Sequence, residues 1–136
     1  MIVDDEIFNL QGMIIILKAS ARHLELPDNL IDGIVDLASD GQQALDMVRQ
    51  RFLNFGISYD LIITDIQMPV LDGYQSAKMI REFHSDNMVP QPTIIACSGH
   101  TEQSYINKAW MHDIDEFLPK PIKIDVTIEI LREFVR

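Results

Sequence analysis

The apolar run Leu61 to Thr64 (LIIT) leads directly into the charged side chain of Asp65. A continuous apolar run of this kind is typical of a parallel strand that is covered by helices on both faces. Pro69 and Gly73 follow a short distance later, and they indicate a turn before the next helix. The stretch therefore predicts a buried strand that presents one carboxylate at its end.

Short apolar runs of this type alternate with helical patterns along the whole chain. In the helical patterns, apolar residues recur at the i, i+3, i+4 and i+7 spacing of an amphipathic helix. The expected strands are residues 1–3, 34–38, 61–64, 92–97 and 116–119. The expected helices are residues 6–18, 44–52, 74–83, 102–111 and 126–135, and residues 19–33 are expected to form a long, partly irregular connection.

The order of strand then helix, repeated five times, predicts an α/β fold. Parallel strands need crossover connections, so this alternation favours a parallel sheet with helices on both faces. With 136 residues, 47% of them hydrophobic, the chain fits one domain with one core. We therefore expect residues 1–136 to form a single domain.

Charge and composition exclude several classes of function. The chain has 21 acidic and 11 basic residues, a formal charge of −10, which disfavours a direct nucleic-acid partner. It contains no apolar segment of the roughly 18 residues that a membrane span needs, and no secretory signal pattern. A single cysteine, Cys97, rules out an internal disulfide and is expected to be a core residue in a reducing, cytoplasmic setting.

Polar side chains follow the ends of several expected strands: Asp4, Asp5, Asp65, Ser98 and Lys120. Ligands of open parallel sheets bind at the carboxyl ends of the strands, so these residues are candidates for one site. Three neighbouring carboxylates repel one another unless a cation neutralises them, and Mg²⁺ is a hard ion that takes carboxylates, waters and a phosphate. A lysine and a hydroxyl beside that ion suit an incoming phosphoryl group.

Four motifs then carry a family resemblance: VDDE with Asn9, DLIITDIQMPVLDGYQSAKMIRE, PTIIACSG and FLPKPI. Together they span almost the whole chain, which resembles the receiver domain of two-component response regulators. The resemblance implies a flavodoxin-like (βα)5 three-layer sandwich with a parallel five-stranded sheet in the order 2-1-3-4-5. The sequences of these motifs are similar to those of receivers in hybrid sensor histidine kinases, which act in phosphorelays.

The resemblance also implies a role for each acidic residue. Asp65 would be the phospho-acceptor, taking its phosphoryl group from a phosphohistidine on a histidine kinase or histidine phosphotransfer domain. Asp5 and Asp65 would ligate Mg²⁺ directly, Asp4 would do so mainly through water, and the backbone carbonyl of Gln67 would complete the protein ligands.

Further residues would bind the phosphoryl group and transmit its arrival. By resemblance, Lys120 would contact the phosphoryl group, Ser98 would donate its hydroxyl to it, and the Gly99 amide would lie nearby. Phe117 would swing inward when Ser98 moves, which would alter the face formed by the fourth helix, fifth strand and fifth helix. The bond between Lys120 and Pro121 resembles the cis peptide of the family.

The remaining candidates are a glutamine and the histidines. Gln67 and His100 lie two residues beyond the acceptor and the switch hydroxyl, and the resemblance implies that they tune the lifetime of the aspartyl phosphate. His23, His84 and His112 show no metal-binding spacing with one another, and the sequence favours surface positions for most of the histidines.

Other interpretations stay open. Asp65 alone could cap the next helix, and Asp4 and Asp5 could cap the first helix. The chain could be a non-phosphorylated pseudo-receiver that binds proteins, or an aspartyl-nucleophile phosphohydrolase, although the second acid expected of such enzymes is replaced by Gln67. The first strand has only three residues before Asp4 and no output domain follows, so we expect either a stand-alone receiver or one excised from a larger protein. The oligomeric state is left open.

Overall fold

The computed structural model describes residues 1–99 and 102–135. Along the chain the elements are β1 (Ile2–Val3), α1 (Ile7–His23), α2 (Leu30–Ile34), β2 (Leu37–Ala38), α3 (Gly41–Phe55), β3 (Leu61–Asp65), α4 (Gly73–Asp86), β4 (Thr93–Ser98), α5 (Gln103–Met111), β5 (Glu116–Pro119) and α6 (Ile124–Phe134). Among the described residues, no helix has the length and apolar character needed to cross a bilayer.

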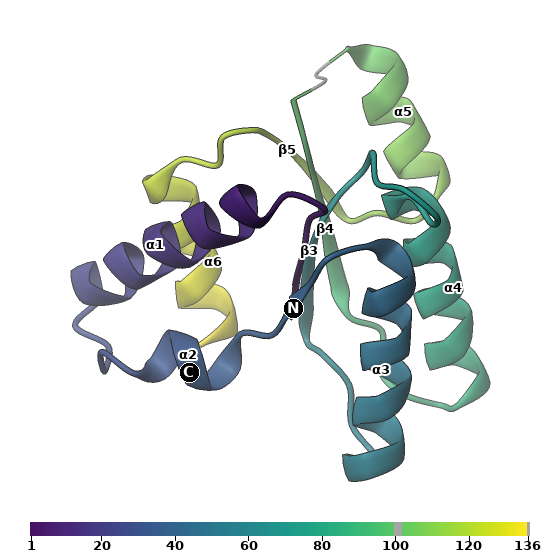
Figure 1. Cartoon of the computed structure of the whole chain (residues 1–136), viewed down its shortest axis with the longest axis horizontal. Coiled ribbons are helices and arrows are strands. Elements are labelled where there is room, and N and C mark those ends of the chain that lie inside the picture. Colours follow the sequence, from purple (N-terminus) through teal and green to yellow (C-terminus); the bar gives the residue numbers. More distant parts are fainter. Residues whose placement is uncertain (100–101, 136) are drawn as a thin grey trace.

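The strands form one parallel sheet in the order β2-β1-β3-β4-β5. Helices α1, α2 and α6 lie on one side of the sheet, and α3, α4 and α5 lie on the other (Figure 1). The predicted flavodoxin-like α/β sandwich with strand order 2-1-3-4-5 is therefore confirmed.

Alternate residues of the central strands supply the core on each face of the sheet. Ile62 and Ile94 belong to the cluster formed with α3 and α4, whereas Ile63 and Ile95 belong to a cluster with Ile130 of α6. This alternation follows from the two-residue period of a strand. Because both faces are covered, the strand residues must be apolar on both sides, which accounts for the unbroken run LIIT.

The region between the first helix and the second strand differs from its prediction. Helix α1 continues to His23 instead of ending near residue 18, and residues 30–34 form the additional helix α2. Ile31 of α2 is fully buried in the cluster beside α1. The expected strand over residues 34–38 is reduced to Leu37–Ala38, because β1 offers backbone partners only at Ile2 and Val3.

A buried polar contact holds the extended part of α1 against α6. The hydroxyl oxygens of Ser20 and Thr127 lie 2.6 Å apart, and both side chains are fully buried. Ser20 Oγ also lies 2.8 Å from the carbonyl oxygen of Ile16, and Thr127 Oγ1 lies 2.8 Å from that of Ile124, so the two hydroxyl protons are shared among three contacts. Satisfied buried polar groups of this kind favour one docking of two helices over others.

The remaining elements begin and end within about three residues of their predicted bounds, and β5 matches its prediction at both ends. Helix α4 starts with a capping box, in which Asp72 accepts from the Gln75 amide at 2.9 Å and Gln75 accepts from the Asp72 amide at 3.1 Å. Such a cap fixes the first turn of the helix. It therefore also fixes the end of the loop that follows Asp65.

Candidate functional site at the carboxyl edge of the sheet

Four strands deliver polar side chains to the carboxyl edge of the sheet. Asp65 is the last residue of β3 and Ser98 the last residue of β4, while Asp4 follows β1 directly and Lys120 follows β5 directly. The strands are parallel, so these ends lie along the same edge. In register, Asp65 is opposite Cys97, and Ser98 is opposite Pro119.

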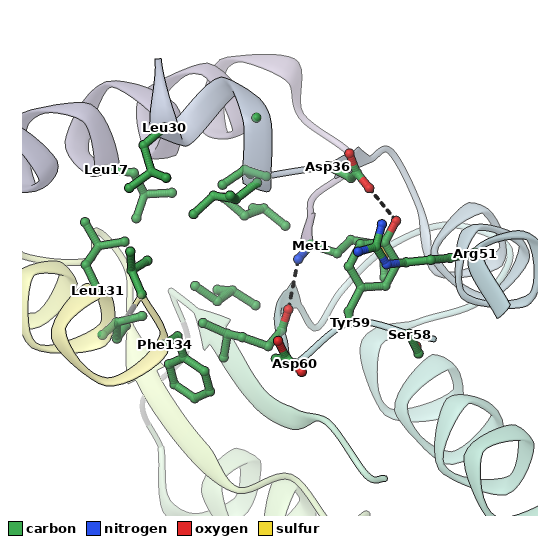
Figure 2. Close-up of a pocket in the computed structure, with 18 residues that line it drawn as sticks. Met1, Leu17, Leu30, Asp36, Arg51, Ser58, Tyr59, Asp60, Leu131 and Phe134 are labelled. Atoms are coloured by element: carbon green, nitrogen blue, oxygen red, sulfur yellow. Dashed lines mark hydrogen bonds between the residues drawn. The ribbon is translucent and has the colours of Figure 1, made fainter. Parts of the chain in front are cut away.

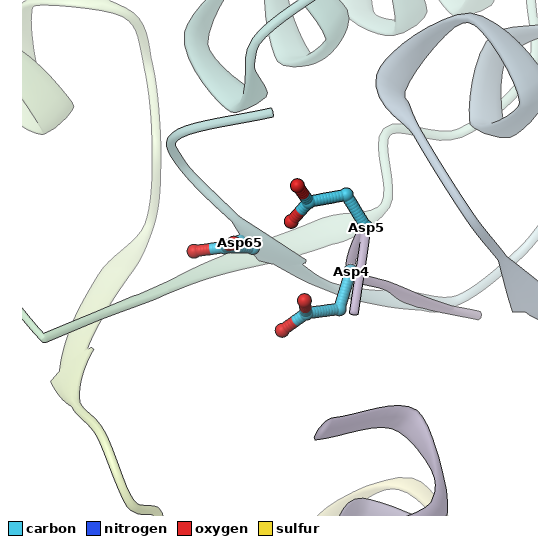
Figure 3. A group of neighbouring side chains, drawn as sticks. All are labelled: Asp4, Asp5 and Asp65. Carbon is cyan, nitrogen blue, oxygen red and sulfur yellow. The ribbon is translucent and has the colours of Figure 1, made fainter. Parts of the chain in front are cut away.

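Three carboxylates meet at this edge. One oxygen from each of Asp4, Asp5 and Asp65 lies within 4.8 Å of the others, and the three carboxyl groups point toward the same side of the strands (Figure 3). Asp4 is buried, Asp65 is partly buried and Asp5 is exposed. The cluster is thus open to solvent on the side of Asp5 and closed on the side of Asp4.

Lys120 lies between two of these acids. Its Nζ is 2.8 Å from Oδ2 of Asp4 and 3.2 Å from Oδ1 of Asp65. Three carboxylates and one ammonium leave a formal charge of −2, which a divalent cation would neutralise. Mg²⁺ binds oxygens at 2.0–2.1 Å, so ligands on opposite sides of the ion are roughly 4 Å apart. The chosen oxygens of the three acids lie within 4.8 Å of one another, which is close to this separation.

Hydrogen bonds hold Asp4 in place from the other side. Its Oδ1 accepts from the Glu6 amide at 2.9 Å and from Nδ2 of Asn9 at 3.3 Å. Asn9 is part of the first motif, but no role was assigned to it from the sequence. Its position in the first turn of α1, shortly after Asp4 and Asp5, is the signal that could have indicated a contact with the acids.

The environment shifts the pKa of both central groups. Burial raises the pKa of Asp65 above its ordinary value and the negative charge of Asp4 raises it further, while Lys120 opposes the shift. Burial alone lowers the pKa of Lys120, but its hydrogen bond to Asp4 and the charges of Asp65 and Asp4 outweigh burial, so that its pKa is raised. Lys120 therefore stays protonated, and the ionised form of Asp65 is destabilised in the absence of further positive charge.

The loop after β3 is packed tightly on the backbone of Asp65. The Gly73 amide donates to the carbonyl oxygen of Ile66 at 2.8 Å. A Cβ atom at Gly73 would overlap the carbonyl oxygen of Asp65, so the close approach requires glycine at this position. The amide of Ile66 also donates to Oδ1 of Asp65 at 2.9 Å, which orients the carboxylate.

The other predicted site residues lie around this centre with different exposure. Ser98 is 2% exposed, and its carbonyl oxygen accepts from the Lys120 amide at 2.9 Å. Gln67 and Gly99 are exposed, and Phe117 is partly buried against the core cluster of α3 and α4. The bond between Lys120 and Pro121 is cis, as the resemblance implied. His100 lies outside the described residues.

Positions were also expected for Cys97 and for the histidines. Cys97 is 4% exposed, and burial raises the pKa of its thiol to about 12, so the prediction of a core cysteine is confirmed. His84 is an exception to the expectation that most histidines lie at the surface, because its side chain is fully buried. Its Nδ1 donates to the Pro90 carbonyl oxygen at 2.9 Å, and its Nε2 is 2.9 Å from Oγ of Ser58.

A cavity of about 430 Å³ lies at the amino edge of the sheet, away from the acids (Figure 2). On its wall the Tyr59 hydroxyl donates to Oδ2 of Asp36 at 2.6 Å, and the Arg51 guanidinium lies 5.0 Å from the centre of the Tyr59 ring. None of the three clustered carboxylates lines this cavity. A second cavity, of about 370 Å³, does adjoin the site, with Asp4, Asp65 and Lys120 at its polar end.

Comparison with known proteins shows which family and which relatives the chain resembles. The sequence model of the family described as response regulator receiver domain matches residues 1–132. The chain is 38% identical over 106 residues to the osmosensing histidine protein kinase SLN1 of Saccharomyces cerevisiae, covering 76% of this chain and 8% of that protein. It is 36% identical over 103 residues to probable histidine kinase 2 of Oryza sativa subsp. indica, covering 70% and 10%. The chain thus spans about a tenth or less of these relatives.

Solved structures show the same fold. The receiver domain of the response regulator NarL from Mycobacterium tuberculosis matches with a TM-score of 0.72 at 20% identity, covering 97% of this chain and 90% of that one. A second match comes from the co-crystal structure of the histidine phosphotransfer protein Ypd1 and the receiver domain of Ssk1 from Saccharomyces cerevisiae. Its TM-score is 0.72 at 26% identity, covering 98% of this chain and 85% of that one.

Proposed function

The chain belongs to the response regulator receiver domain family, and from this premise we propose that Asp65 accepts a phosphoryl group from a phosphohistidine. The donor is a histidine kinase or a histidine phosphotransfer domain of a phosphorelay. Relatives named as histidine kinases support this donor class, as does the solved complex of a receiver with a histidine phosphotransfer protein. We also infer that residues 1–136 act as one receiver domain on the cytoplasmic side.

The observation that carries the proposal is the position of the Asp65 carboxylate between a lysine and two further acids. One oxygen of Asp65 attacks phosphorus, a new P–O bond forms, and the P–N bond to the histidine breaks as the imidazole leaves. An aspartate is a weak nucleophile, so alignment and neutralisation of charge supply the rate.

The acids fit Mg²⁺ in charge and in ligand type. Asp5, Asp65 and the Gln67 carbonyl would hold the ion directly, with Asp4 acting through water. When bound, the ion would balance the charge of the carboxylates and of the phosphoryl oxygens. Asp4 also holds Nζ of Lys120 at 2.8 Å, which orients the ammonium toward Asp65.

Lys120 then contacts a phosphoryl oxygen once the group has arrived, because its ammonium is already within 3.2 Å of Asp65. Ser98 donates its hydroxyl to a second oxygen, and the Gly99 amide lies beside a third. Movement of Ser98 leads Phe117 inward, which changes the surface formed by α5, β5 and α6. New charge-assisted hydrogen bonds provide the free energy for this change.

Gln67 and His100 are proposed to set the lifetime of the aspartyl phosphate by flanking the path of the hydrolytic water. Substituting both residues and measuring the dephosphorylation rate tests this assignment, and an unchanged rate would remove it. The exposed side chain of Gln67 is an amide, which is not a general acid. This favours a stable acceptor over a phosphohydrolase with turnover.

Incubation with acetyl phosphate and Mg²⁺, followed by intact mass spectrometry, tests the acceptor assignment. We expect the chain to gain one phosphoryl group, and Asp65→Asn to gain none. Asp60→Asn is a matched control, because Asp60 is an exposed aspartate that precedes the other end of β3. No gain at any Mg²⁺ concentration would favour the pseudo-receiver, and a gain that persists in Asp65→Asn would place the acceptor elsewhere.

A further inference from the structure

Thr64 is the one polar side chain in the apolar run of β3 that precedes Asp65. It is 3% exposed. The residues paired with it in the neighbouring strands are Val3 and Ala96, whose side chains carry no hydrogen-bonding group. A buried hydroxyl costs free energy unless it forms a hydrogen bond, and valine would fill a similar space without that cost. The partner of the Thr64 hydroxyl therefore indicates what this residue does.

That partner is the peptide unit that joins Asp65 to Ile66. Oγ1 of Thr64 donates to the backbone carbonyl oxygen of Asp65 at 2.8 Å. The N–H of the same peptide unit belongs to Ile66, and it donates to Oδ1 of the Asp65 carboxylate at 2.9 Å. The C=O and the N–H of a trans peptide unit lie in one plane and point in opposite directions. The hydroxyl of Thr64 therefore fixes the direction of the amide that orients the carboxylate.

Gly73 contacts the same peptide unit from the loop. Its amide donates to the carbonyl oxygen of Ile66 at 2.8 Å, and its Cα packs closely against the carbonyl oxygen of Asp65. That carbonyl oxygen is thus held by a hydrogen bond from Thr64 and by packing against Gly73. A rotation of the peptide unit would break the first contact and disturb the second. Together the two contacts hold the peptide in one orientation.

Two donors act on Oδ1 of Asp65, and they differ in rigidity. Nζ of Lys120 is 3.2 Å away, but it ends a flexible side chain and is shared with Asp4. The Ile66 amide is part of the backbone and is held through Thr64. Asp65 is partly buried, and a directed hydrogen bond counts for more there than in water. The amide is therefore the donor that sets the carboxylate plane.

We propose that Thr64 is a positioning residue for phosphoryl transfer, and that its hydroxyl aims the Asp65 carboxylate at the incoming phosphorus through the peptide between Asp65 and Ile66. This inference rests on the proposed function. The attacking oxygen must lie roughly in line with the bond that breaks, and poor alignment of a nucleophile lowers the rate of reaction. Because Thr64 acts through the backbone, its loss lowers the rate of transfer rather than the affinity for a small donor.

Thr64→Val tests this role, because it replaces the hydroxyl with a methyl group of similar size. With saturating acetyl phosphate and Mg²⁺, phosphorylation followed by intact mass spectrometry should slow by about tenfold, the effect of losing one orienting hydrogen bond. The acetyl phosphate concentration that gives the half-maximal rate should stay unchanged. In NMR spectra, the amide proton of Ile66 should move to higher field as its bond to Oδ1 weakens. Thr64→Ser keeps the hydroxyl and should restore both the rate and the resonance.

Thr127→Val is the matched control. Thr127 is also a fully buried threonine, and its Oγ1 lies 2.8 Å from the carbonyl oxygen of Ile124, between α1 and α6. This variant should keep the natural rate and the natural Ile66 resonance. An equal loss of rate in Thr127→Val and in Thr64→Val would overturn the proposal, because any buried hydroxyl would then matter as much.

The natural rate in Thr64→Val would also overturn the proposal, as would a Thr64→Ser variant as slow as Thr64→Val. If Thr64→Val does not fold, Thr64→Ala removes the same hydroxyl without added bulk and is judged by the same criteria. If the natural chain takes up no phosphoryl group, the proposed function fails. The Ile66 resonance in the Thr64 variants then decides the positioning role by itself, and an unchanged resonance overturns it.

Discussion

The carboxyl edge of the sheet gathers like charges around an aspartate with a raised pKa, whereas two buried side chains of the amino edge, His84 and Tyr59, have hydrogen-bond partners. At the carboxyl edge, Asp65 has a single cation, Lys120, shared with another acid. At the amino edge, both ring nitrogens of His84 have partners and the Tyr59 hydroxyl is bonded to Asp36. The two edges of one sheet therefore differ in how their charged and polar groups are paired.

The largest expected effect comes from the amino edge. His84→Ala would leave a cavity and remove the partners of Ser58 and of the Pro90 carbonyl, and we expect a loss of about 3 kcal/mol in the free energy of unfolding. Urea denaturation measures this loss, and Ser58→Ala should cost about 1 kcal/mol. Phosphorylation by acetyl phosphate should be unchanged where the protein is folded. A loss below that of Ser58→Ala would break the contrast between the edges.

Gly73→Ala tests the packing of the loop on Asp65. The added methyl group would overlap the Asp65 carbonyl oxygen, so we expect a loss of about 2 kcal/mol and slower phosphorylation by acetyl phosphate. Gly12→Ala is the control for stability, since a Cβ at Gly12 meets nothing within 4 Å and alanine favours a helix by up to about 1 kcal/mol. Equal stability of the two variants would show that the loop yields easily.

Asp65→Asn tests whether the carboxyl edge is under electrostatic strain. Burial raises the pKa of Asp65, so removing its charge should stabilise the chain by about 1 kcal/mol when a chelator is present. Added Mg²⁺ should stabilise the natural chain more than the variant, because binding to the folded state adds to stability. Thermal unfolding with and without Mg²⁺ measures both effects. A variant less stable than the natural chain in chelator would contradict the electrostatic account.

The smallest effect is a pH dependence at the amino edge. Burial lowers the pKa of His84 below its ordinary value of 6.5, so the folded chain favours the neutral ring. The stabilisation is complete above 6.5 and is lost as the pH falls through that value, because the unfolded chain then binds the proton more readily. The stability difference between the natural chain and His84→Ala should shrink from pH 7.5 to about 5.5, by less than the limit of about 1.4 kcal/mol per pH unit. A constant difference would contradict this assignment.

The fold could be predicted wherever a pattern allowed one interpretation. The run ending at Asp65 has strand propensity, buried character and a following turn, and all three agree with β3. The helix over residues 30–34 was missed, because the proline, the Asp-Asn pair and the glycine within residues 19–33 indicate an irregular connection. Burial of Ile31 beside α1 decides for the helix, and that contact is not visible in the sequence.

The residues at the strand ends could be predicted from the sequence, but the ion pairs and hydrogen bonds between side chains could not. The parallel order of the strands was enough to bring Asp4, Asp65 and Lys120 to one edge. The shorter distance from Lys120 to Asp4 than to Asp65 depends on side-chain geometry. The burial of His84 depends on partners in two separate loops, and no spacing within α4 indicates them.

Thiol labelling of the single cysteine can measure how often the core beside β4 opens. Cys97 is opposite Asp65 across β3 and β4, it is almost fully buried, and burial raises its thiol pKa to about 12. Thiol reagents attack the thiolate, and the thiol packs on one face of the sheet with Ile122 and Ile130, so labelling is slow until this face opens. The rate of labelling therefore reports how often this face of the sheet opens beside the strand that ends at Asp65, without any introduced probe.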